Sequence, residues 1–290
     1  STSSSTSDRR PAVIDRLGGA LRLIHPFPSV LDGIVVAGVA LIATGDAPTA
    51  TRLGLSMTAL QASIGALNDL VDAPADAGHK PGKPIPRGLV SHRFAMGVVA
   101  AGAGAGLALA LGSGWPLVIL GGVGLTIGYA YDLAAKGTAW SWAPFAVGIP
   151  ILPLYGWFGA AGSMPGWFVA LLPMAILVGA SIAIANARAD LERDEAAGRG
   201  SVAVRLGLRR SWWVGTTCLL AVLVVALGWI TATGKVTWPG VGVVLLGGAM
   251  ALAGSWIARE ASPATRERGW QALALGVAIV AIGWVSLVSA

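Results

Sequence analysis

Two short acidic runs stand out in a chain that otherwise carries few charged residues. Both place an asparagine and two aspartates at four-residue steps, and we call them the first acidic frame (Asn68, Asp72, Asp76) and the second acidic frame (Asn186, Asp190, Asp194). On an α-helix, residues four apart share one face, so each frame points an amide and carboxylates in one direction. Mg²⁺ prefers oxygen ligands and usually combines one or two carboxylates with phosphate oxygens. Two such frames facing each other would bind a diphosphate through bridging magnesium ions.

A basic, glycine-containing loop follows each frame, at 75–90 and 195–207. These loops supply four candidate phosphate contacts: Lys80, Lys83, Arg87 and Arg199. Pro74 disfavours a helix beyond Ala73, so we expect Asp76 on the loop, folded back over the site. Acidic helix ends with basic loops can also be solvated topology signals, but the repeated spacing argues against that interpretation.

Other site chemistries find little support in the sequence. Zinc would need Cys or His ligands, which the frames lack, and the single cysteine, Cys218, excludes an intrachain disulfide. The sequence contains neither a phosphate-binding loop ending in Gly-Lys-Ser/Thr nor a Gly-x-Ser-x-Gly hydrolase elbow.

The elements that must position these residues are membrane helices. Of 290 residues, 55% are hydrophobic and 12% charged, and the mean hydropathy is +0.72, whereas a soluble domain carries about 25% charged residues. A span needs about 20 residues, and nine apolar segments fit: 26–44, 53–71, 94–112, 115–131, 142–160, 166–187, 212–232, 238–258 and 270–289. We therefore expect an all-α integral membrane protein, a bundle of nine transmembrane helices over residues 20–290, preceded by a flexible tail at residues 1–19.

The basic residues predict how this bundle sits in the membrane. Of the 20 Lys and Arg residues, all but Arg52 and Lys235 fall on the tail and the loops after spans 2, 4, 6 and 8, which leaves 18 on one side. Cytoplasmic loops carry such an excess, so we expect the N-terminus and the frames at the cytoplasmic face and the C-terminus outside. The active site then lies at the cytoplasmic ends of helices 2 and 6.

Both frames and their loops resemble known signatures. NDLVDAPAD (68–76), followed by KPGKPIPRGLVS (80–91), is similar to the first motif of the UbiA-type intramembrane prenyltransferases, and NARADLERDEAAGRGSVAVRLG (186–207) to the second. The resemblance implies Mg²⁺-dependent transfer of an isoprenyl chain from a prenyl diphosphate to a lipophilic, aromatic or glycerol-lipid acceptor, with release of diphosphate. The sequences of the two loops are closer to the branch of the family that makes geranylgeranylated glycerol lipids and chlorophyll-type products than to the quinone branch.

The resemblance also implies roles for individual residues. Magnesium and diphosphate would be held by the residues Asn68, Asp72, Asp76, Asp190 and Asp194. Further substrate contacts would come from Asn186, Lys80, Lys83, Arg87, Lys136, Arg199 and Arg22. The ring face of Tyr131 could stabilise the allylic cation.

Three positions depart from the family pattern. His25 stands where span 1 commonly has arginine, in Arg-Leu-Ile-His-Pro. The Tyr-x-x-x-Lys motif after span 4 is one residue longer here, from Tyr131 to Lys136. Arg193 replaces the glycine that often precedes the last aspartate of the second motif, and it could add a positive charge at the diphosphate.

Two alternatives stay open at the level of sequence. A terpene cyclase of the same fold would ionise the same substrate and quench the cation within the prenyl chain. A transporter would show polar residues near the bilayer midplane, where the sequence offers chiefly Asp32 in span 1. An acid inside a membrane segment is a candidate functional residue, although pairing or packing would also explain it.

Overall fold

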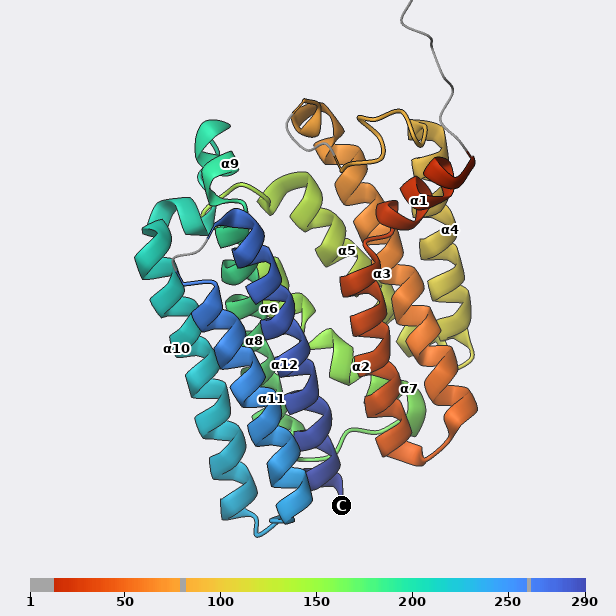
Figure 1. The fold of residues 1–290 in the computed structure, drawn as a ribbon. Helices are drawn as coiled ribbons and strands as arrows, with labels where there is room; N and C mark the ends of the chain where they lie inside the picture. The colour runs from red at the N-terminus through yellow and green to blue at the C-terminus, as the bar shows by residue number, and fades with distance from the viewer. Residues whose placement is uncertain (1–12, 79–81, 260–261) are drawn as a thin grey trace, which may run out of the picture.

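In the described ranges, helices joined by turns and short irregular links make up the structure. The computed structural model describes residues 13–78, 82–259 and 262–290. Its α-helices and one π-helix (η1) are α1 (Val13–Leu23), α2 (Pro26–Thr44), α3 (Ala47–Asp76), α4 (His92–Leu111), α5 (Trp115–Ala130), η1 (Tyr131–Ala135), α6 (Ala143–Gly148), α7 (Ile151–Ala161), α8 (Phe168–Ala189), α9 (Leu191–Ala196), α10 (Val202–Ala232), α11 (Trp238–Ile257) and α12 (Pro263–Ser289) (Figure 1).

The predicted membrane spans are present as helices. Within the described ranges, eight helical segments are long and apolar enough to cross a membrane: α2, α4, α5 with η1, α6 with α7, α8, α10, α11 and α12. The remaining predicted span, 53–71, forms the middle of α3. Polar residues such as Gln61 and Asn68 lower the hydropathy of α3, yet it packs along both α2 and α4. The chain is a multi-pass integral membrane protein.

Residues 13–19, which the sequence placed in the flexible tail, belong to α1 instead. The helix has apolar residues at helical spacing, and Ile14, Leu17 and Leu21 are exposed while Leu23 is buried. Such a stripe favours an amphipathic helix even beside a Ser/Thr-rich segment.

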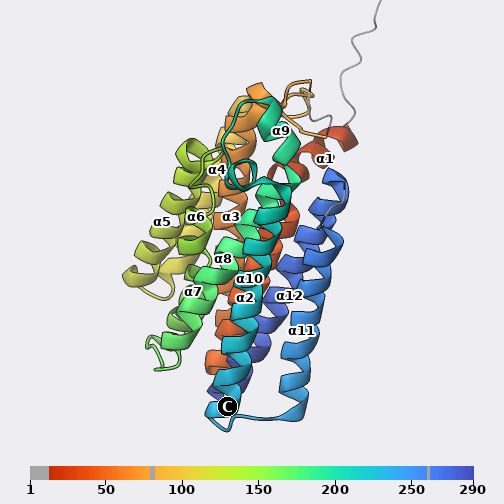
Figure 2. The ribbon, with the colours of Figure 1, turned by 90° about the vertical axis from the view of Figure 1, so that its left-hand side faces the viewer.

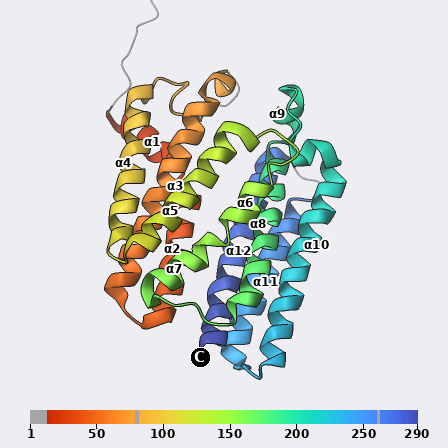
Figure 3. The same cartoon turned by 180° about the vertical axis from the view of Figure 1, so that it is seen from behind.

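The long helices run roughly parallel (Figure 2), and they form two groups that lie side by side in Figure 1. In the first group α3 packs between α2 and α4; in the second α8 packs on α10, and α11 packs on α12. Helix α12 contacts both α2 and α8, and so joins the groups. From behind, α5, α6 and α7 lie between them (Figure 3).

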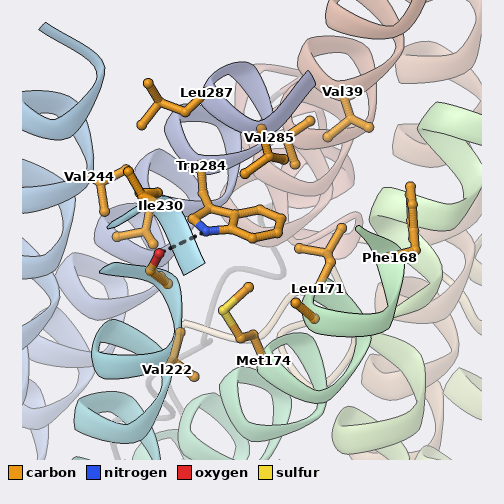
Figure 4. Packing of buried hydrophobic residues seen from close by; sticks show 14 of the residues in the cluster. Val39, Phe168, Leu171, Met174, Val222, Ile230, Val244, Trp284, Val285 and Leu287 are labelled. Carbon is orange, nitrogen blue, oxygen red and sulfur yellow. Dashed lines mark hydrogen bonds between the residues drawn. The ribbon is translucent and has the colours of Figure 1, made fainter. Parts of the chain in front are cut away.

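A tryptophan-centred core closes the end of the bundle near the C-terminus. Trp284 is 1% exposed and donates a hydrogen bond from Nε1 to the carbonyl oxygen of Ala226 at 3.1 Å. Leu171 and Met174 of α8 pack around it together with Val222 of α10 (Figure 4). This core holds α8, α10 and α12 together at this end of the bundle.

Helix packing near the site depends on one glycine and one break. A Cβ on Gly179 of α8 would lie 2.2 Å from the carbonyl oxygen of Phe145, so only glycine lets α8 approach α6 this closely. The span expected at 142–160 is divided into α6 and α7 around Pro150, which has no N–H for a helical hydrogen bond.

Candidate active site

The two acidic frames meet at one end of the bundle, as their loops predicted. The ends of α3 and α8 both lie at the upper end in Figure 1, opposite the C-terminus. They border a cavity of about 630 Å³, which we call the main cavity. Asn68 and Asp72 line it from α3, and Asn186 and Asp190 line it from the end of α8. The first two members of each frame therefore share one space.

The third member of each frame lies outside this lining. Asp76 is the last residue of α3, so the expectation that it sits on a loop beyond a break near Ala73 is wrong. Pro74 removes the hydrogen bond to the carbonyl of Leu70, a small loss in a last helical turn in which Ala73 and Asp76 are buried. Asp76 is 5% exposed.

The second frame does not lie on one continuous helix. Helix α8 ends at Ala189, Asp190 has φ −100° and ψ 3°, and the short helix α9 follows. The expectation of one shared face therefore holds from Asn186 to Asp190 but not through Asp194. Asp194 is buried on α9, with its Oδ1 3.8 Å from Nη1 of Arg199.

Basic side chains accompany the cavity acids. Asp72 pairs with Lys136, and Asp190 pairs with Arg193. Both basic residues line the main cavity, as do Lys83 and Arg22. Of the other basic residues expected here, Arg87 is exposed on its loop and Arg199 contacts Asp194; neither lines the cavity. Lys80 lies outside the described residues.

The π-helix η1 explains how the longer spacing between Tyr131 and Lys136 is accommodated. The N–H of Lys136 donates to the carbonyl oxygen of Tyr131 at 2.8 Å, a bond that spans five residues. A π-turn takes one more residue than an α-turn and is frequent at functional sites. Tyr131 lines the cavity and makes an edge contact with Phe145 (centroids 5.1 Å apart), while the Lys136 amine reaches Asp72.

Asp132 is a cavity residue that the sequence interpretation missed. It is 4% exposed, and its Oδ1 accepts a hydrogen bond from Nδ2 of Asn68 at 2.7 Å. Its Oδ2 is buried without a hydrogen-bond partner in the described ranges. Its only signal in the sequence is its place beside Tyr131, because it is the π-helix η1 that turns the Asp132 side chain toward Asn68.

His25 and Asp69 form a second cluster that the sequence analysis did not assign to the site. Oδ1 of Asp69 lies 2.8 Å from Nε2 of His25 and also pairs with Lys83. His25 is the last residue of the link between α1 and α2 and has φ 47°. Its side chain packs against Gly65 of α3. His25 therefore ties the start of α2 to α3, at the residue that follows Asn68.

Two buried arginines support the second frame from behind. Arg188 donates from Nη2 to the carbonyl oxygen of Arg259 at 2.6 Å, and Arg266 pairs with Glu192 of α9. Burial would raise the pKa of Glu192, but the Arg266 guanidinium outweighs it and holds that pKa below its usual value. These contacts fix the chain on both sides of Asp190.

The donors around the main cavity suit magnesium better than a metal caged by protein alone. No group of three or more His, Cys, Asp or Glu side chains converges on one point within the described ranges. Mg²⁺ binds through one or two carboxylates together with phosphate oxygens and waters. Oxygen donors on both walls, with the orphaned Oδ2 of Asp132, fit that coordination.

A smaller, apolar cavity of about 140 Å³ adjoins the main cavity. Phe27, Asp32, Phe145 and Trp270 line both spaces. Apart from Asp32, the lining of this second cavity is apolar, and it extends to the Trp284 core. A polar cavity with an apolar cavity beside it suits a substrate with a charged head and a hydrocarbon chain.

Comparisons with known proteins agree with this architecture. A digeranylgeranylglyceryl phosphate synthase of Methanopyrus kandleri is 30% identical over 212 residues, covering 68% of this chain and 74% of that protein. A chloroplastic chlorophyll synthase of Oryza sativa is 28% identical over 181 residues, covering 58% of this chain and 48% of that protein. A solved structure of a UbiA homologue from Archaeoglobus fulgidus bound to DMAPP and Mg²⁺ has a TM-score of 0.69 at 20% identity, covering 90% of this chain and 99% of that one. The model of the UbiA prenyltransferase family matches residues 33–277. This chain therefore belongs to the UbiA prenyltransferase family.

Proposed function

We propose that this prenyltransferase moves an isoprenyl chain from a prenyl diphosphate to a lipophilic acceptor, with Mg²⁺ as cofactor, at the cytoplasmic face of the membrane. The observation that carries the proposal is the main cavity, which the first two members of each acidic frame and four basic residues line, together with the apolar cavity that adjoins it. The basic end would take the diphosphate, and the apolar end would take the hydrocarbon chain.

The charges at the polar end explain why a metal is needed. Magnesium, when bound, supplies the positive charge that lets carboxylates and diphosphate share the cavity. Asn68, Asp72 and Asp190 would hold it from the two walls, with Asp76 and Asp194 behind them. Asp132 would orient Asn68, because its hydrogen bond to Nδ2 leaves the amide oxygen of Asn68 to bind the metal.

Transfer requires charge to move onto the leaving group. The bond between C1 of the prenyl chain and the diphosphate oxygen breaks, and its electron pair leaves with the diphosphate. Lys83 and Lys136 line the cavity where that charge develops and stabilise it electrostatically. The ring of Tyr131 borders the same space and would stabilise the allylic cation, which the acceptor then attacks.

The relatives suggest what the acceptor resembles. Digeranylgeranylglyceryl phosphate synthase and chlorophyll synthase are both similar to this chain. A UbiA homologue from A. fulgidus was solved with DMAPP and another complex with GPP, each with Mg²⁺. We therefore favour a prenyl diphosphate donor and a glycerol-lipid acceptor over an aromatic one.

The decisive experiment measures product and metal dependence together. Purified protein in lipid nanodiscs is given labelled dimethylallyl, geranyl or geranylgeranyl diphosphate with geranylgeranylglyceryl phosphate, and products are identified by mass spectrometry. We expect a prenylated acceptor, loss of turnover with EDTA and recovery with Mg²⁺. Full turnover in metal-free buffer would contradict the role of the frames, and a cyclised hydrocarbon without acceptor would favour a terpene cyclase.

A further inference from the structure

Asp32 is a carboxylate inside the bundle that the magnesium and diphosphate machinery does not use. It lies six residues after Pro26 on α2, about 9 Å along the helix axis. It lines both the main cavity and the apolar cavity. Asp32 is half-buried, and no hydrogen bond or ion pair to its side chain is present in the described part of the chain.

An unpaired acid at this depth is costly, because neither lipid nor apolar side chains can hydrogen-bond it. Packing does not explain Asp32, since a leucine of similar size would fill the space without that cost. Side chains on a helix tilt toward its N-terminus, and the N-terminus of α2 is the end that carries His25 near the first frame. Asp32 therefore lies where the main cavity and the apolar cavity adjoin, in the part of α2 that follows His25.

The polar residues that share the main cavity with Asp32 indicate what it would bind. Gln61 of α3 and Gln271 of α12 line the same main cavity. Neither residue belongs to an acidic frame, and no basic side chain pairs with Asp32 in the described ranges. A carboxylate without a cationic partner, in a cavity that neutral amides also line, suits a neutral hydrogen-bond donor such as a hydroxyl group.

We propose that Asp32 binds the nucleophilic hydroxyl group of the acceptor and accepts its proton, an inference that rests on the proposed function. In the transfer step the acceptor oxygen forms a bond to C1 of the prenyl chain with its lone pair. The bond from C1 to the diphosphate oxygen breaks and its electrons leave with diphosphate, while the hydroxyl proton passes to a carboxylate oxygen of Asp32. The acceptor class is thus a lipid alcohol, and Asp32 is a catalytic residue on the acceptor side.

The test separates the donor half of the reaction from the acceptor half. Asp32→Asn keeps the shape but removes the basic oxygen, and Asp32→Glu keeps the acid. The matched control is Asp46→Asn at the other end of α2, where the side chain caps α3 by accepting from the N–H of Thr49 and asparagine caps equally well. The probes are labelled geranylgeranyl diphosphate with Mg²⁺, alone or with geranylgeranylglyceryl phosphate, and thermal unfolding of each variant.

We expect Asp32→Asn to lower transfer to the alcohol about a hundredfold, the usual size of a proton-transfer contribution. Diphosphate release by hydrolysis, without acceptor, should stay within about twofold of wild type, and Asp32→Glu should recover part of the transfer. The unfolding temperature of Asp32→Asn should rise, because an unpaired buried charge is removed; a structural acid would instead lower it.

Either of two results would overturn the role of Asp32. One is transfer by Asp32→Asn within about threefold of wild type; the other is an equal loss of hydrolysis and transfer, which would place the residue on the donor side or in the fold. If instead the wild-type protein released no diphosphate from any prenyl diphosphate, that result would contradict the proposed function itself. The two failures are therefore distinguishable.

Discussion

Replacing Asp72 by asparagine should nearly abolish catalysis while leaving the protein folded. Asp72 is 5% exposed, lines the main cavity and pairs with Lys136, whose side chain is 20% exposed. Asparagine matches aspartate in shape, and the lysine can reach water, so the bundle should persist. Loss of one charge contact in the transition state costs on the order of 3 kcal/mol, or about a hundredfold in rate.

The assay is magnesium-dependent diphosphate release from labelled geranylgeranyl diphosphate, measured across a range of Mg²⁺ concentrations. Asp190→Asn should behave alike, because Asp190 occupies the equivalent position of the second frame and borders the same cavity. Asp46→Asn, on the solvent side of the α2–α3 turn, should stay near wild type. Losses below about threefold for both cavity variants would mean that the frames are solvated helix ends, and the proposed chemistry would lose its basis.

Four further outcomes are expected. Lys136→Gln should slow diphosphate release about a hundredfold, whereas Lys235→Gln, on an exposed loop at the opposite end of the bundle, should change it less than twofold in the same assay. Arg193→Gly removes the partner of Asp190 and should weaken prenyl diphosphate binding in equilibrium titrations. Unchanged binding would mean that Arg193 does not contact the diphosphate and serves only as a positive charge that sets membrane orientation. Gly179→Leu places atoms against the Phe145 carbonyl and should lower thermal stability by more than about 1 kcal/mol, while Gly228→Ala, which faces open space, should not. Accessibility tags in the two loops that follow the acidic frames should read cytoplasmic and a C-terminal tag external; loops read on opposite faces would exclude a shared site.

The features predicted from sequence are those that local rules determine. Hydropathy located the helical segments, because a backbone in lipid must satisfy its own hydrogen bonds. The repeated spacing identified Asn68, Asp72, Asn186 and Asp190, which all line the main cavity. Their convergence required only that both loops lie at the same end of the bundle, and the charge asymmetry had already indicated this.

The features that escaped prediction depend on tertiary contacts. Asp132 is a site residue because η1 turns it toward Asn68, and no local pattern distinguishes a π-turn from an α-turn. The break at Asp190 follows from contacts such as Glu192 with Arg266, which lie 74 residues apart. Pro74 shows the reverse error, because a strong local rule was overridden in the last turn of a well-packed helix.

The ion pairs in the cavity suggest why donor and metal should bind together. Asp69 with Lys83, Asp72 with Lys136, and Asp190 with Arg193 make the polar end nearly neutral, which lowers the cost of placing charges next to a membrane interior. Mg²⁺ alone would meet three basic side chains, and diphosphate alone would meet three carboxylates. When both bind together, the metal would bind the carboxylates and the diphosphate would bind the basic side chains, so that every charge has a partner of opposite sign. Under the proposed function, tight binding would thus be reserved for the metal-bound diphosphate, which is the leaving group of prenyl transfer.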